Sequence, residues 1–292
     1  MSQAAKIKLF FIVNALASIG LNIGVIGVNW FIIDVTHQNS ILGLYGALSL
    51  ISSFLTLAWG SSLTDKYNKI ALLKYCCFGQ GLIFILTALL YYLHFPSLHI
   101  IYGLAVLNMP LIVIFSTVSI GAVPTLWDKE NLSKGNSALE ITIQVGAMLA
   151  ALLTGVLYKY AGFSLLLFVG AILAILAGAI LAFTKYSFEY RLPEKESFFS
   201  SLKKGFSYLC QNRHLFLYGI VVFIPTIVIS TSNTVIPGYV EQTLHQGSIV
   251  YGIGDMCFAI GALLAGFIAP RLAKRFIEEK SSLLFSVLSL LS

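Results

Sequence analysis

Residues 9–33 read LFFIVNALASIGLNIGVIGVNWFII, a run of 25 residues without a charged side chain. A helix of this length and composition can cross a lipid bilayer, which takes about 20 apolar residues. The whole chain of 292 residues has the same character, because 58% of its residues are hydrophobic and only 10% are charged. Soluble domains carry about 25% charged residues. The composition therefore predicts an all-α polytopic membrane protein and excludes a soluble enzyme, a disordered chain and a small disulfide-rich secreted domain.

Charged and polar breaks divide the chain into eight predicted membrane spans. These spans are 9–33, 41–63, 72–93, 100–122, 138–158, 163–184, 214–238 and 249–270. A further apolar run, 281–292, has twelve residues. In a helix they rise only about 18 Å, which is too short to cross. The chain is therefore expected to end within a ninth span.

Lysine and arginine lie almost entirely on one side of this predicted topology. Seventeen of the eighteen fall in tails and connections on the side of the N-terminus, and Lys159 alone falls on the other. Because basic residues favour the cytoplasmic side, we expect a cytoplasmic N-terminus in the cell (inner) membrane. These loops account for the net charge of +6, so the lipid bilayer is the expected partner and nucleic acid is not.

The N-terminal run has one alternative interpretation. Lys6 and Lys8 precede an apolar stretch that contains Ala15, Leu16 and Ala17, and this order is typical of a cleaved signal peptide. Against it, the apolar run continues without a break, and removal of the first span would spoil the alternation of charge. The four cysteines show no metal-binding spacing and are interpreted as reduced packing residues.

One long polar connection, 185–213, separates six spans from those that follow. Residues 1–184 are predicted to form an N-terminal six-helix bundle, and residues 214–292 an incomplete C-terminal bundle of two spans and a partial third. Apolar residues in the connection recur at spacings of three and four, which favours an amphipathic helix on the inner membrane surface over a plain solvated loop. These residues are Phe199, Leu202, Phe206 and Leu209.

Two connections share a basic pattern. Residues 61–69 read SSLTDKYNK after span 2, and residues 266–275 read GFIAPRLAKR after span 8. Each places one basic residue just after the span and another three positions later. Duplicated helix bundles would produce this correspondence, although basic residues at a cytoplasmic helix end are expected in any case.

The loop after span 2 resembles the motif G-x-L-A-D-R-x-G-R-K of the major facilitator superfamily. The matching residues are Leu63, Asp65, Lys66 and Lys69, and the departures are Ser61, Asn68 and Ile70. More specifically, the chain is similar to the exporter branch that includes macrolide-efflux proteins and the enterobactin exporter. The stretches behind this similarity are Leu132 to Ser137; Gly205, Tyr208 and Leu215; and Tyr251, Gly252, Gly261, Ala262, Leu263 and Gly266.

The resemblance implies a major-facilitator-type fold with a six-helix N-terminal bundle plus a partial C-terminal bundle. Such transporters have twelve spans, and in them the acidic residue of the motif docks against span 11. The eight predicted spans of this chain include no such partner for Asp65. The implied conformational gate comprises Asp65, Lys66, Lys69, Gly266, Arg271, Lys274 and Arg275. Span 5 departs from the family, because it has Gly146 and Gly155 but no Gly-Pro pair.

Polar residues within the spans are few, and alternating access requires some of them to line a cavity. The candidates for lining a substrate cavity are Asn22, Asn29, Asn108, Gln144 and Asn233. Each has a structural alternative, in which the amide bonds a neighbouring helix or lies at headgroup level.

Three acids approach the hydrocarbon region and are candidates for proton coupling. A carboxyl group there is costly unless it is paired or protonated. Asp255 lies inside span 8 and is the strongest candidate. Glu140 opens span 5, where a positive helix N-terminus could stabilise it, and Asp34 ends span 1, where it could be a solvated helix terminus.

The expected function is transport, by efflux, of a small organic compound through alternating access, with poor or absent transport by a truncated chain. The alternative is a non-transporting membrane subunit or scaffold that assembles with another membrane polypeptide supplying the missing helices. No phosphate-binding loop, catalytic motif or metal-binding cluster is present in the sequence, so we expect no enzymatic activity, cofactor or metal.

Overall fold

The computed structural model describes residues 3–94, 97–128, 131–184, 207 and 210–277. All regular structure in these residues is helical, which confirms the predicted all-α fold. The elements are α1 (Gln3–Thr36), α2 (Asn39–Lys66), α3 (Lys69–Tyr92), α4 (Leu98–Leu126), α5 (Leu132–Ala182), α7 (Arg213–Gly238), the π-helical turn η2 (Tyr239–Thr243) and α8 (Ser248–Ile277). The predicted linker helix and the apolar run 281–292 lie outside the described residues.

The helices have the length and composition that a bilayer requires. Six of the described helical stretches are long and apolar enough to cross a membrane. A helix satisfies its own backbone hydrogen bonds, which lipid cannot do. Polar side chains cap helix ends. At α3, the side chain of Asn68 accepts hydrogen bonds from the backbone N–H groups of Ile70 and Ala71.

The long helix α5 contains two predicted spans that meet at a kink. Gly162 has φ 77° and ψ 175° within the element, a conformation open to glycine because it has no Cβ. The predicted break at 159–162 is therefore a kink at a single glycine and contains no separate loop. The N-terminal end of α5 also lies six residues before the predicted start of span 5, at Leu132.

The N-terminal group, which we define as α1–α5, forms a closely packed bundle. Helix α1 packs mainly against α5, and α3 packs against α4 and α5. Phe31 of α1 stacks on Phe163 of α5 with 4.0 Å between the ring centroids. A methyl group built on Gly20 would lie only 2.9 Å from the carbonyl oxygen of Gly170, so glycine permits the two helices to approach this closely.

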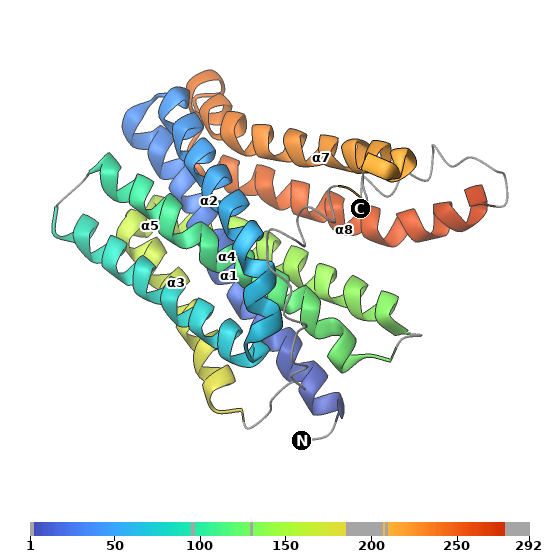
Figure 1. Cartoon of the computed structure of the whole chain (residues 1–292). Coiled ribbons are helices and arrows are strands. Elements are labelled where there is room, and N and C mark those ends of the chain that lie inside the picture. The colour runs from blue at the N-terminus through green and yellow to red at the C-terminus, as the bar shows by residue number, and fades with distance from the viewer. Residues whose placement is uncertain (1–2, 95–96, 129–130, 185–206, 208–209, 278–292) are drawn as a thin grey trace.

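The C-terminal group, which we define as α7, η2 and α8, touches the N-terminal group at one end. Figure 1 shows α7 and α8 running away from α1–α5, so that the two groups form a V. We call the joined end, near residues 37–39 and 239–248, the contact end, and the opposite end the divergent end. Large apolar side chains on α2 toward the divergent end are exposed, such as Phe54 at 74%.

Candidate functional site

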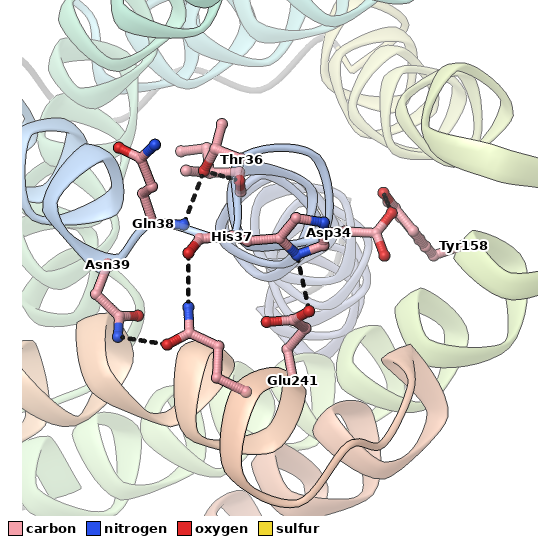
Figure 2. Close-up of polar contacts among 9 residues, drawn as sticks. Asp34, Thr36, His37, Gln38, Asn39, Tyr158 and Glu241 are labelled. Atoms are coloured by element: carbon pink, nitrogen blue, oxygen red, sulfur yellow. Dashed lines mark hydrogen bonds and ion pairs between the residues drawn. The ribbon is translucent and has the colours of Figure 1, made fainter.

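The rim of the contact end joins the two groups through polar side chains. Figure 2 shows Glu241 of η2 facing His37, with 2.8 Å between its Oε1 and the imidazole Nδ1. Gln242 donates from Nε2 to the carbonyl oxygen of His37 at 3.0 Å and accepts from Nδ2 of Asn39 at 3.4 Å. These three contacts tie the turn between α1 and α2 to η2.

Local backbone geometry explains why these side chains meet. His37 has φ 52° and its N–H donates to the carbonyl oxygen of Ile33, which ends α1 and turns the chain into α2. A Cβ on Gly238 would lie 1.8 Å from Oδ1 of Asn39. The absence of a side chain at Gly238 thus leaves the space in which Asn39 reaches η2.

A second layer of cross-group contacts lies one to two helical turns inward from the rim. Nδ2 of Asn29 on α1 approaches the carbonyl oxygen of Asn233 on α7 at 3.5 Å. Trp30 stacks on Tyr251 of α8, with ring centroids 5.4 Å apart and planes inclined by 22°. Asp255 lies one turn further along α8, on the same helix face as Tyr251. This inner cluster brings two of the sequence candidates together across the groups, namely Asn29 and Asn233.

Two helix backbones touch beside the inner cluster. A Cβ on Gly252 of α8 would lie 2.5 Å from the carbonyl oxygen of Ala151 and 3.1 Å from Cα of Gly155, both on α5. The buried Ser248 hydroxyl donates to the carbonyl oxygen of Gly155 at 3.0 Å. Gly155 was noted in the sequence for the missing Gly-Pro pair, and in the structure it lies where the backbones of α5 and α8 approach each other closely.

Asp34 lies at the end of α1 and is exposed. Its Oδ2 accepts a hydrogen bond of 2.8 Å from the Tyr158 hydroxyl on α5. This bond joins two helices of the N-terminal group and does not cross to the C-terminal group.

Two further candidates, Glu140 and Gln144, lie on one face of α5. Nε2 of Gln144 donates to Oε1 of Glu140 at 2.8 Å, across one helical turn. Glu140 is eight residues past the start of α5 at Leu132. The expectation that a helix N-terminus stabilises it is therefore wrong, because that effect fades within the first turn.

The amides of Asn22 and Asn108 lie within the N-terminal group, away from the inner cluster. Nδ2 of Asn22 donates to the carbonyl oxygen of Ser18 at 2.8 Å, within its own helix. Asn108 on α4 is 1% exposed, and its Oδ1 is buried with no hydrogen-bond partner among the described residues. A buried polar atom without a partner is costly.

The motif after span 2 lies where α2 ends and α3 begins. Nζ of Lys69 donates to the carbonyl oxygen of Gly121 on α4. Asp65 and Lys66 belong to the last turn of α2, but their side chains are outside the described part of the structure. The same holds for Gly266, Arg271, Lys274 and Arg275, all of which lie on α8.

Sequence reasoning missed the residues of the rim and the aromatic pair. His37 and Glu241 are 204 positions apart, and polar residues are expected in both turns whether or not they touch. Trp30 reads as an ordinary apolar membrane residue, and Tyr251 was noted only for the family resemblance. A usable signal was present, since both turns were predicted on the same side of the membrane. Within the described residues, no group of three metal-binding side chains comes together.

Comparison with curated proteins finds transporters. The chain is 25% identical over 275 residues to a protein named staphyloferrin A transporter from Staphylococcus aureus (strain NCTC 8325 / PS 47), covering 91% of this chain and 67% of that protein. It is 22% identical over 257 residues to the uncharacterized MFS-type transporter YvqJ of Bacillus subtilis (strain 168), covering 82% and 61%. The chain thus spans about two thirds of the length of these relatives.

Solved structures share the fold at low sequence identity. A bacterial homolog of the human lysosomal transporter Spinster, described as inward-facing and unoccupied, superposes with a TM-score of 0.73 at 12% identity, covering 95% of this chain and 64% of that one. A D-xylose-proton symporter gives 0.65 at 16% identity, covering 94% and 70%.

The family model that matches the chain is described as Major Facilitator Superfamily and covers residues 10–292. It accounts for the apolar helices, the two helix groups and the relatives named as transporters. The chain therefore belongs to the major facilitator superfamily of membrane transporters.

Proposed function

We propose that this protein exports a small organic compound across the cell (inner) membrane by alternating access. The observation that carries the proposal is the V formed by two helix groups, which touch at the contact end and diverge at the other. A change in the side of access requires only that the groups part at one end and meet at the other. The named transporters among the relatives support the same conclusion.

The divergent end faces the cytoplasm in this proposal, and the contact end faces outward. The strong bias of lysine and arginine supports this orientation, and so does the superposition on a structure described as inward-facing. Exposed positions test it, because Tyr67 lies between α2 and α3 and Gln246 precedes α8. In intact cells a membrane-impermeant maleimide should label Gln246→Cys. It should label Tyr67→Cys only after permeabilisation, and the opposite pattern would reverse the orientation.

The contact end is held by interactions weak enough to break during transport. The His37 side chain is 65% exposed, and an exposed ion pair contributes at most about 1 kcal/mol. Oε2 of Glu241 is buried and has no hydrogen-bond partner among the described residues, which reduces the gain from closure. Closure at the rim is therefore suited to a state that must also open.

Asp255 is the proposed carrier of a coupling proton. It is partly buried on α8, one turn from Tyr251. A carboxyl group at this depth is costly when it is ionised and unpaired, so its charge responds to whether water reaches it. Opening of the contact end would hydrate the inner cluster and closure would exclude water from it.

The other sequence candidates have separate proposed roles. Asn29 and Asn233 close the cavity from the contact side, whereas Asn22, Asn108 and Gln144 are the polar groups available to a substrate. The α2–α3 motif, with Asp65, Lys66 and Lys69, and the corresponding α8 residues Gly266, Arg271, Lys274 and Arg275 would control conformation without touching substrate. No described contact favours the scaffold alternative.

Transport by purified protein in liposomes tests this function. Staphyloferrin A, which the name of the S. aureus relative suggests, is the first compound, followed by a panel of neutral, cationic and anionic compounds. A proton gradient across the liposome membrane should drive the compound in the direction opposite to the proton flow. A pH-sensitive dye trapped inside the liposomes should report the coupled proton movement. Asp255→Asn should abolish proton movement. If no compound in the panel moves faster than through empty liposomes, the export proposal fails.

A further inference from the structure

We propose that Glu140 and Gln144 of α5, together with Asn22 of α1, bind a protonated amine group of the transported compound. The inference rests on the proposed transport function and gives it a substrate class. Glu140 is an acidic side chain to which the proposed function gives no role. It lies within a candidate membrane span, Lys134–Ala182, where a carboxyl group is costly unless it is paired or protonated.

One face of α5 meets the C-terminal group. Ala151 and Gly155 belong to this face, because a Cβ on Gly252 of α8 would lie 2.5 Å from the carbonyl oxygen of Ala151 and 3.1 Å from Cα of Gly155. Residues seven or eleven positions apart share a helix face, since these spacings are close to whole numbers of turns. Gln144 and Glu140 precede Ala151 by seven and eleven residues. Both therefore lie on this face, further toward the divergent end.

Asn22 reaches the same region from α1. It precedes Ile26 by one turn, and Ile26 packs in the apolar cluster that joins the two groups. The Ser18 hydroxyl donates to the carbonyl oxygen of Ile143 at 2.9 Å, which places α1 beside α5 at the level of Gln144. Nδ2 of Asn22 approaches the same hydroxyl oxygen at 3.3 Å. The two amides therefore lie on neighbouring helices, about one turn apart along them.

The carboxylate of Glu140 has an amide partner and no basic partner. Its Oε1 accepts a hydrogen bond of 2.8 Å from Nε2 of Gln144, and among the described residues Glu140 forms no ion pair. Lys134, in the first turn of α5, instead donates to Oδ1 of Asn131 at 3.0 Å. Charges within membrane spans usually pair with opposite charges. A positively charged compound supplies that partner for Glu140.

The acceptors at this position suit an ammonium group that retains its N–H bonds. An alkylammonium has up to three N–H donors and no acceptor. Glu140 offers carboxylate oxygens, and the amides of Gln144 and Asn22 offer carbonyl oxygens because their N–H groups donate within the protein. Hydrogen bonds between an ammonium and a carboxylate are charge-assisted and about twice as strong as neutral ones.

The position is open to a ligand from the side of the C-terminal group. The α8 face that meets α5 contains Ser248 and Gly252. It continues toward the divergent end with Ala259 and Ala262, whose side chains are small. Glu140 is exposed on the facing side of α5. A compound can therefore approach the carboxylate between the two groups.

Two matched probes test the preference for an amine. Monodansylcadaverine carries a primary amine, and its N-acetyl derivative carries the same dansyl group without the charge. Each is titrated into the full chain in phosphatidylcholine nanodiscs, with empty nanodiscs as the blank for partition into lipid, and dansyl fluorescence reports binding. The parent protein should bind the amine about tenfold more tightly than the acetylated probe, because only the amine forms charge-assisted hydrogen bonds.

Substitutions assign the preference to Glu140. Glu140→Gln should abolish it and leave the affinity for the acetylated probe unchanged, whereas Glu140→Asp keeps the charge and should retain part of it. Gln144→Met removes the amide and should weaken amine binding by about two- to tenfold. Asp128→Asn is the matched control for net charge, because Asp128 is an exposed acid just after α4. It should behave as the parent does.

The outcomes separate this inference from the proposed function. A parent that binds both probes equally, or binds neither, overturns the inference. So does a preference that survives in Glu140→Gln or falls equally in Asp128→Asn, because the charge then acts from elsewhere. If Glu140→Gln loses amine binding but still moves a neutral or anionic compound in liposomes, both the site and the transport function stand. Amine binding that depends on Glu140 in a protein that moves no compound supports the site and contradicts export.

Discussion

The interior of the N-terminal group and the contact end are two interfaces built on different principles. Within the N-terminal group, apolar side chains interdigitate and glycines let backbones touch, as at Gly20 with Gly170 and Phe31 with Phe163. At the contact end, polar side chains meet across short turns, and backbones touch mainly where Gly252 meets α5. The first interface has the character of a permanent core, and the second that of a joint.

The difference follows from what lipid and water each do to an interface. Parting helices inside the bilayer replaces helix packing by lipid packing, and close van der Waals fit decides the balance. Parting the rim exposes His37, Glu241 and Gln242 to water, which replaces their hydrogen bonds. Each such bond contributes only about 0.5–1.5 kcal/mol net. A transporter needs both properties, so the variants below should affect the two interfaces separately.

Gly20→Val should have the largest effect, because it attacks the permanent interface. The added side chain meets the carbonyl oxygen of Gly170 at 2.9 Å and the backbone of Ala174 at 3.3 Å, and backbone cannot move aside. Overpacking of this kind costs about 1–3 kcal/mol. Thermal unfolding in detergent should show a clear loss of stability and of folded yield.

Gly103→Val on α4 is the matched control, since nothing lies within 4 Å of a Cβ built there. The thermal unfolding temperature of this variant should equal that of the parent protein. Equal losses from both variants would mean that valine itself, and not the α1–α5 contact, is harmful.

Gly252→Val should open the joint and leave the N-terminal group folded. Its Cβ would meet the backbone of α5 at 2.5 Å, and the strain is relieved if α8 separates from α5 at the contact end. Spin labels on Val35→Cys and Gln246→Cys report this, because both positions are exposed and belong to different groups; the exposed Cys210 and Cys257 are first replaced by serine. Pulsed electron paramagnetic resonance of the protein in lipid nanodiscs gives the distance between the labels and the closed population. The distance should lengthen, while the unfolding temperature changes little.

Gly254→Val lies half a turn away on the same helix and has nothing within 4 Å of its Cβ. It should keep the short distance of the parent. A Gly252→Val protein that also keeps the short distance would show that the backbone contact does not hold the ends together.

Glu241→Gln should weaken closure by a smaller amount. The pair with His37 is partly exposed, so its loss should change the closed population by at most about fivefold, equivalent to about 1 kcal/mol. Where the His37 imidazole is protonated, the difference from the parent should shrink as salt is added, because salt screens exposed charges. His245→Asn is the control, as His245 is exposed and shares the φ of 52° found at His37. An effect of Glu241→Gln that is independent of salt would contradict an electrostatic contribution.

The sequence predicted these two interfaces to different degrees. The uncharged run 9–33 predicted α1, because only a helix satisfies its backbone in lipid. Asn29, Asn233 and Asp255 were selected because polar groups in spans are rare, and the structure brings Asn29 and Asn233 together across the two groups. His37 and Glu241 were missed, since a polar residue in a turn needs no special explanation and their pairing depends on how the groups meet.

The error at Glu140 has a related cause. The hydrophobic pattern marks where a helix enters lipid, whereas α5 begins at Leu132 in a stretch that is polar. Helix ends that lie outside the hydrocarbon region are set by local capping and packing, for which hydropathy carries no signal. The positions of the spans were therefore predictable, and the positions of their ends were not.

Tyr158→Phe should have the smallest effect. It gives the sharpest test of whether the interior of the N-terminal group and the contact end behave as separate interfaces. Tyr158 lies near the joint, yet its bond to Asp34 connects α5 to α1 inside the N-terminal group. Removal of the hydroxyl should lower stability by at most about 1 kcal/mol, measured by thermal unfolding, and should leave the Val35–Gln246 distance unchanged. Tyr239→Phe, on the exposed face of η2, controls for loss of a hydroxyl. A longer label distance in Tyr158→Phe would mean that the N-terminal group does not move as one body, because a bond within it would then control the contact between the groups.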